Sequence, residues 1–273
     1  MLFPRACLYR IFPLLVLSIL APAVAAAQLS ELDQIQVAPP MSQVQPPSKD
    51  ASAAELEKRG DELRAEKAYL DSLDYFRASL AKAPNNAPVL NKTGIVELLL
   101  QRYREAAKHF EQALKNDRKF AEAYNNLGVV HYERKKYSAA IKQYKKAIEL
   151  SPDGASFYSN LGAAYFARKD FERASEAYTQ AVRLDPMIFD HTSHTGIAAQ
   201  MASPQDRAHY DYVLAKLYAK MGDSDHSLQY LRKALEDGYK GVDGALTDPE
   251  FADLRKDTRF TDLMKARPVA ISE

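Results

Sequence analysis

Four glycines recur along the chain at a constant interval of 34 residues: Gly60, Gly94, Gly128 and Gly162. The residues around them repeat with the same step, most clearly between residues 121–154 and 155–188. A constant step of this length is the sequence signature of a repeat array. One helix pair cannot bury its apolar face alone, so we expect stacked units that share a continuous core.

The two clearest copies share a pattern of aromatic, small and turn-forming residues at helical spacing. A polar break separates two apolar periodicities in each copy, which predicts two helices per unit. The first copy contains Tyr124, Leu127, Gly128, Ala140, Tyr144, Ala147 and Pro152. The second contains Tyr158, Leu161, Gly162, Tyr165, Ala174, Tyr178, Ala181 and Pro186.

This pattern resembles the tetratricopeptide repeat (TPR). The resemblance implies an all-α fold: a right-handed α-solenoid of about five TPR helix pairs, closed by a C-terminal capping segment. Gly128 and Gly162 would occupy helix interiors, where glycine costs about 1 kcal/mol relative to alanine. We expect them to allow close approach of the second helix, with Tyr144 and Tyr178 filling the gap between the helices.

The repeat pattern predicts the organisation of the chain. We place repeats at residues 53–86, 87–120, 121–154, 155–188 and 208–241, so that the array spans 53–241. The fifth copy is out of phase because of an insertion of 19 residues at 189–207. Residues 242–273 are expected to form a C-terminal cap and tail, in which four residues cover the open apolar end of the last repeat: Phe251, Leu254, Phe260 and Leu263.

The N-terminus resembles a secretory signal peptide. Arg5 and Arg10 precede an apolar run at residues 11–26, and residues 25–27 form an Ala-x-Ala cleavage site. We predict a signal peptide at 1–27 and an exported, periplasmic protein that is not inserted in a membrane after cleavage. The alternative is a membrane anchor formed by an uncleaved segment 11–27. Residues 28–52 are rich in Pro, Gln and Ser and are predicted to be a flexible linker.

Charge and motifs argue against several functions. The chain has 37 basic and 36 acidic residues, whereas a nucleic-acid binder normally has a basic excess. We expect the local basic clusters at residues 134–136 and 142–146 to be a turn and a solvated helix face rather than a nucleic-acid site. The only cysteine, Cys7, lies in the predicted signal peptide, so the mature chain would have no disulfide or cysteine-based metal site.

The sequence contains none of the catalytic or phosphate-binding motifs considered next. It lacks a Gly-rich phosphate loop, a Gly-x-Ser-x-Gly motif and a His-Glu-x-x-His motif. We therefore expect no catalytic residues, no cofactor and no metal. His191 and His194 in the insertion leave open a metal-binding alternative, which would need a third ligand nearby.

The resemblance to TPRs also implies a concave binding groove lined by the first helix of each repeat. The candidate groove residues are Asn91, Ile95, Leu98, Asn125, Asn126, Val129, Tyr132, Asn160, Ala163 and Phe166. The asparagine amides could hydrogen-bond a peptide backbone. The apolar members would mark an interaction site if they are exposed, or could be covered by the insertion or the N-terminal linker.

The sequence thus predicts a non-enzymatic adaptor of the cell envelope, which binds a peptide or helix of a partner protein in its concave groove. The alternative is a structural scaffold of an envelope assembly, in which the chain associates with itself.

Overall fold

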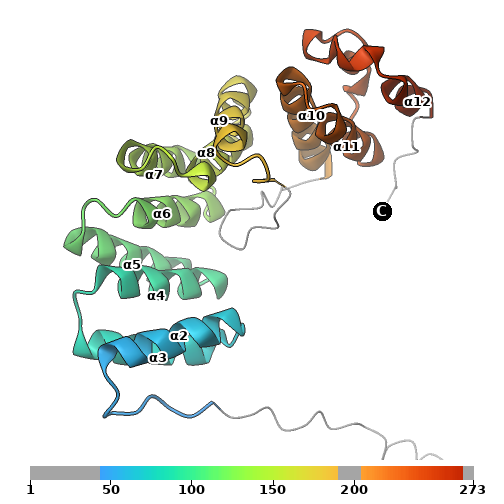
Figure 1. Ribbon diagram of the computed structural model, residues 1–273. Coiled ribbons are helices and arrows are strands. Elements are labelled where there is room, and N and C mark those ends of the chain that lie inside the picture. The colour runs from blue at the N-terminus through green and yellow to red at the C-terminus, as the bar shows by residue number, and fades with distance from the viewer. Residues whose placement is uncertain (1–43, 190–203, 267–273) are drawn as a thin grey trace, which may run out of the picture. The chain divides into compact units, whose positions relative to one another are not determined.

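The computed structural model describes residues 44–189 and 204–266. In these ranges the chain is entirely helical (Figure 1). The α-helices are α2 (Ala53–Ala65), α3 (Tyr69–Lys82), α4 (Ala87–Leu99), α5 (Tyr103–Asn116), α6 (Ala121–Glu133), α7 (Tyr137–Leu150), α8 (Ala155–Ala167), α9 (Phe171–Leu184), α10 (Pro204–Met221), α11 (Ser224–Glu236) and α12 (Thr258–Ala266). Three short 3-10 helices lie between α11 and α12: η1 (Val242–Leu246), η2 (Pro249–Phe251) and η3 (Leu254–Lys256).

Consecutive helices pack in pairs, from α2 with α3 to α10 with α11. We call the first helix of each pair the A helix and the second the B helix. Each of the first three B helices also packs against the A helix that follows it, so the pairs stack one on another (Figure 1). The prediction of an all-α array of stacked helix pairs is confirmed.

The glycines are sites of close contact between the two helices of a pair. A Cβ atom added at Gly128 would lie 2.5 Å from the ring of Tyr144, and Gly162 has the same relation to Tyr178. Both rings are buried. Phe76 and Phe110 contact Gly60 and Gly94 in the same way in the first two pairs. The predicted reason for the glycines, close approach of an aromatic residue from the B helix, is confirmed.

The turns between A and B helices share one backbone conformation. Lys67, Gln101, Lys135 and Lys169 have positive φ angles of 62°, 58°, 57° and 62°. These four residues follow one another at the 34-residue step. The α10–α11 turn has Gly222 at φ 81° in the corresponding place. The left-handed conformation is strained for a residue with a Cβ and is readily adopted by glycine.

Ion pairs join the first two helix pairs. The side chain of Glu97 is buried and accepts hydrogen bonds from Arg77 at 3.2 Å and from Arg102 at 3.5 Å. Arg77 belongs to α3, so this contact joins two successive repeats. Buried carboxylates are tolerated where such partners replace the lost hydration.

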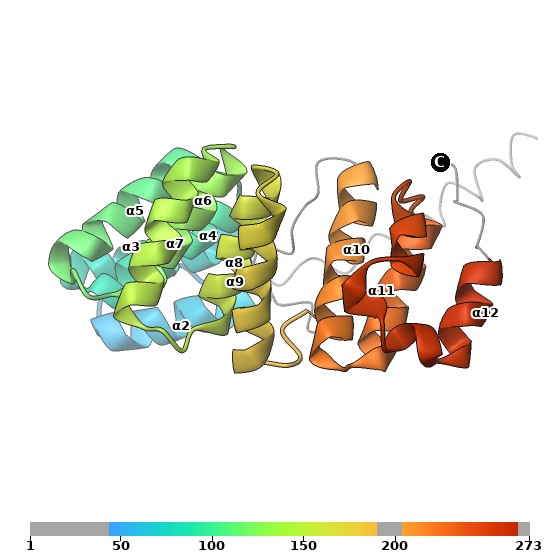
Figure 2. The ribbon, with the colours of Figure 1, turned by 90° about the horizontal axis from the view of Figure 1, so that it is seen from above.

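The last described helix pair begins within the segment assigned to the insertion. Helix α10 starts at Pro204, and proline is favoured in the first turn because its missing N–H needs no partner there. After α11 the chain turns through η1 to η3 and α12, which lie beside α10 and α11 in Figure 2. Four apolar residues of this segment are buried in the same cluster as α10 and α11: Phe251, Leu254, Phe260 and Leu263.

Polar contacts attach the C-terminal segment to α10. The Tyr212 hydroxyl donates a hydrogen bond to Asp248 at 2.8 Å, and Lys216 Nζ lies 3.0 Å from the same carboxylate. Partial burial raises the pKa of Asp248, but these hydrogen bonds outweigh it, and the pKa lies below its usual value. The carboxylate is therefore ionised and holds η2 against α10.

Asp211 is a buried carboxylate in α10. Its exposed fraction is 7%. Burial raises the pKa of Asp211 to about 7, and Asp237 adds to this effect while Lys233 and Arg207 oppose it. The ionised form is therefore poorly stabilised in the folded chain.

We predict that two glycine variants lose stability for different reasons. Gly128→Ala should lower the free energy of unfolding by about 1–3 kcal/mol, because the new methyl group collides with the Tyr144 ring. Gly222→Ala has open space around its Cβ, so only the strain of a positive φ remains, at about 1 kcal/mol. Urea unfolding measures both. If Gly128→Ala is as stable as the wild type, the close contact does not limit the packing.

Stability should also depend on the titration of Asp211. Its folded-state pKa of about 7 exceeds the ordinary value of 3.8, so its stabilising protonation is lost as the pH rises through 7. Asp211→Asn should therefore gain about 4 kcal/mol over the wild type above neutral pH, and this gain should shrink towards pH 4. Thermal unfolding across this range tests it, with the exposed Asp262→Asn as control. A gain independent of pH would contradict this assignment.

Candidate functional site

The predicted groove residues lie on three successive A helices. Helix α4 carries Asn91, Ile95 and Leu98; helix α6 carries Asn125, Asn126, Val129 and Tyr132; helix α8 carries Asn160, Ala163 and Phe166. Helix α6 contacts both α4 and α8. The structure therefore brings the three sets of residues together.

Asparagine side chains connect these three helices. Asn126 Nδ2 donates to Asn91 Oδ1 at 3.0 Å, and Asn160 Nδ2 donates to Asn125 Oδ1 at 2.9 Å. Asn125 Nδ2 in turn lies 3.3 Å from Asn126 Oδ1. We call this series, from Asn160 through Asn125 and Asn126 to Asn91, the amide chain. Its polar groups join neighbouring repeats, a role that the sequence alone did not suggest.

Most of the amide chain is enclosed by the array. Asn160, Asn125 and Asn91 are buried, with exposed fractions of 0%, 4% and 7%. Asn126 of α6 is half-buried beside them. Asn126 is therefore the member of the amide chain that a ligand can reach most easily.

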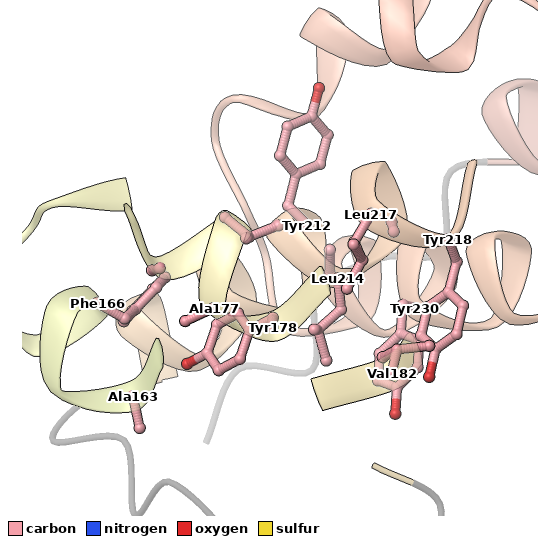
Figure 3. Close-up of a cluster of buried hydrophobic side chains, with 14 of the residues drawn as sticks. Ala163, Phe166, Ala177, Tyr178, Val182, Tyr212, Leu214, Leu217, Tyr218 and Tyr230 are labelled. Carbon is pink, nitrogen blue, oxygen red and sulfur yellow. The ribbon is translucent and has the colours of Figure 1, made fainter. Parts of the chain in front are cut away.

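The apolar residues on α6 and α8 are buried. Val129 and Tyr132 each have an exposed fraction of 8%, and Phe166 of 4%. Ala163 is also buried in the same cluster, which extends to Leu214 and Leu217 of α10 (Figure 3). Burial, with smaller contributions from Tyr137, Glu133 and Asp206, raises the pKa of Tyr132 to about 12. An exposed apolar stripe is thus not found at this end of the groove.

Helix α10 provides part of this cover. The ring of Phe166 lies 5.5 Å from His209 and 5.8 Å from Tyr210, measured between ring centroids. Edge-on aromatic contacts at such distances are favourable. The predicted covering segments, residues 190–203 of the insertion and the linker up to residue 43, lie outside the described residues.

The groove is more accessible at the first two repeats. Ile95 and Leu98 of α4 are half-buried. Beside them, Lys92 Nζ forms ion pairs of 2.6 Å with both Glu57 and Asp61 of α2. Partial burial lowers the pKa of Lys92, but these hydrogen bonds outweigh it and raise the pKa overall. This part of the site combines apolar surface with a fixed set of charges.

Other predicted features fall outside this site. His191 and His194, the signal peptide 1–27 and most of the linker 28–52 lie outside the described residues. Among residues 44–189 and 204–266, no group of three or more side chains could bind a metal ion. In the same ranges, no helix has both the length and the apolar character to cross a membrane.

A cavity that the sequence did not indicate lies between α11 and α12. Its volume is about 410 Å³, and it is lined by Asp225, Leu228, Gln229, Arg232, Arg259 and Leu263. Arg259 pairs at 2.7 Å with both Asp225 and Asp257. Arg232 also lines the cavity.

Family models match most of the described array. A model of the TPR repeat matches residues 94–135 and 130–168, and two models of the tetratricopeptide repeat match residues 155–187 and 210–236. No match was found among the curated proteins.

Solved structures of TPR proteins are similar to the chain in fold. The pilF protein of Pseudomonas aeruginosa has a TM-score of 0.51 and 19% identity, with 79% of this chain and 92% of that chain covered. MamA from Desulfovibrio magneticus RS-1 has a TM-score of 0.49 and 21% identity, covering 67% and 93%. A thermophilic TPR protein of Thermus thermophilus has a TM-score of 0.49 and 19% identity, covering 77% and 100%.

The repeat matches agree with the helix pairs and with their glycine–aromatic contacts. The chain is a tetratricopeptide repeat protein.

Proposed function

We propose that this TPR protein is a non-enzymatic adaptor of the cell envelope, which binds a peptide or helix of a partner protein in the groove of its A helices. TPR arrays are protein-interaction modules, so an adaptor role in general follows from the family. The envelope location rests on the apolar segment and Ala-x-Ala site in residues 1–27.

The observation that carries the proposal is a half-buried amide, Asn126, beside the half-buried apolar residues Ile95 and Leu98. Asn126 uses one amide hydrogen and one acceptor position within the amide chain, so one of each can bind the backbone of a partner. Ile95 and Leu98 lie three residues apart on α4, so both can contact apolar side chains of the same segment. A few polar groups on an apolar surface are typical of peptide-binding grooves.

The remaining predicted residues have a supporting part in this proposal. Asn91 and Asn125 orient the Asn126 amide through their hydrogen bonds, and Asn160 in turn holds Asn125. Val129, Tyr132, Ala163 and Phe166 close the far end of the groove, since they are buried together. The bound segment would therefore lie over α2, α4 and the start of α6.

The charges of α2 and α4 balance one another. Glu57 and Asp61 contribute two negative charges, Lys92 pairs with both, and Arg64 lies 3.4 Å from Asp61, so the group is neutral. The partner segment would therefore be selected by its apolar residues and its backbone rather than by its net charge.

Truncating the apolar side chains of α4 should weaken partner binding. We expect Ile95→Ala/Leu98→Ala to reduce recovery of a cross-linked envelope partner about tenfold, because two apolar contacts of the partner are lost. The matched control is Leu184→Ala/Met187→Ala, which removes two apolar side chains that are 43% and 45% exposed, outside the groove. Cross-linking in the host followed by mass spectrometry measures the recovery.

The outcomes separate the candidate functions. Equal recovery of the partner with a folded groove variant and with the control would contradict binding in the groove. Cross-links only between copies of the chain would favour the self-associating scaffold instead.

Export is tested by the mass of the protein recovered from the periplasm. We expect a chain that begins at Gln28, because cleavage should follow Ala27. Recovery of the intact chain from the membrane fraction would instead favour the anchor formed by residues 11–27.

A further inference from the structure

The turns between A and B helices lie at one end of the stacked helix pairs. The hydrogen bonds between Asn91 and Asn126 and between Asn125 and Asn160 hold successive A helices in the same register. The A–B turns therefore follow one another along one edge, while the connections from α3, α5 and α7 to the next A helix lie at the opposite end (Figure 1). We call residues 66–68, 100–102, 134–136 and 168–170 the turn edge.

Basic side chains dominate the turn edge. Arg134, Lys135, Lys136, Arg168 and Lys169 are all exposed. Within the described ranges, none of these five has an ion pair with a carboxylate. Lys67 continues the row on the first repeat and Arg102 on the second, where it lies 3.5 Å from Glu97.

The positive charge acts on a neighbouring group. Burial lowers the pKa of His131, and the charges of Lys136 and Arg134 lower it further. His131 lies on α6 immediately before the turn. The turn edge has seven cations against two carboxylates, Glu66 and Asp170, which pair with Arg59 and Arg173 outside the turns. Its net charge is therefore positive.

Three of the lysines occupy positions that favour glycine. Lys67, Lys135 and Lys169 have positive φ angles, and the equivalent residue of the fifth helix pair is Gly222. The left-handed conformation costs a residue with a Cβ roughly 1–2 kcal/mol. A residue in this conformation is a common way to end a helix. Three of the four non-glycine residues at this position are lysines, and the fourth is Gln101, so a positive charge stands at the tip of the first, third and fourth turns.

We propose that the turn edge binds an extended, acidic polypeptide segment of a partner. Adjacent A helices are in contact, so successive turns are about 10 Å apart. An extended chain rises about 3.3 Å per residue, so acidic residues spaced about three apart would meet successive turns. Each carboxylate would pair with cations that have no partner in the chain itself.

A flexible chain fits this row better than a flat anionic surface. Helix α9 is strongly inclined to α7 in both views (Figures 1 and 2), so the turns of the third and fourth repeats do not continue along one straight line. A polypeptide can follow such a bend, whereas a lipid bilayer cannot contact the whole row. The surface is separate from the groove, and the inference does not depend on the proposed function.

The test measures binding of a fluorescein-labelled polyglutamate peptide to the full chain by fluorescence anisotropy. We expect binding that weakens with added salt, because exposed charges are screened. Lys135→Gly/Lys169→Gly should bind about fivefold more weakly. This variant removes two charges and relieves backbone strain, so it should be at least as stable as the wild type. Loss of binding would then not reflect unfolding.

Two further variants complete the design. Lys135→Gln/Lys169→Gln removes the same charges without a change to glycine, and decides the outcome if the glycine variant is less stable. Lys115→Gln/Lys119→Gln removes two exposed cations at the opposite end of the helix pairs and should bind normally.

Three results would overturn the proposal: no binding of the peptide by the wild type, equal binding by the turn-edge variants, or binding of phosphatidylglycerol vesicles or DNA in preference to the peptide.

Discussion

The structure depends on the contact between a glycine of each A helix and an aromatic ring of its B helix. A single methyl group at Gly128 would overlap the Tyr144 ring, so the distance between the two helices is set by the absence of a Cβ. The buried ring then fills the space that the close approach creates. Because the same contact recurs in the first four pairs, each pair presents a similar surface to the next. The array is built by repeating this one contact within each helix pair.

Polar contacts between repeats fix how each A helix is aligned along the next, which the packing within a pair does not determine. The amide chain links α4, α6 and α8, and the Lys92 ion pairs link α4 to α2. These groups are the ones that would otherwise be available to a ligand. The proposed binding surface is thus coupled to the array: what remains for a partner is the half-buried Asn126 amide and the half-buried apolar residues beside it.

Individual residues show how far sequence reasoning reached. The spacing of Gly128 and Tyr144 was sufficient to predict their contact, because both positions belong to one local helix pair. The exposure of Tyr132 and Phe166 was not predictable in this way. Their burial depends on α10, which lies beyond an insertion that breaks the 34-residue register. The positive φ angles of Lys135 and Lys169 could not be predicted either, since the sequence indicates a basic turn but not its backbone conformation.

The sequence by itself determined that this chain is an all-α array of TPR helix pairs and which residues fill each pair. These features follow from interactions within a repeat, which the 34-residue period records directly. Only the tertiary structure decided which groove residues are accessible, how the asparagines pair and which cations stay unpaired. Those properties arise from contacts between repeats, where the partner of a side chain lies on another helix pair and its burial depends on how the pairs stack.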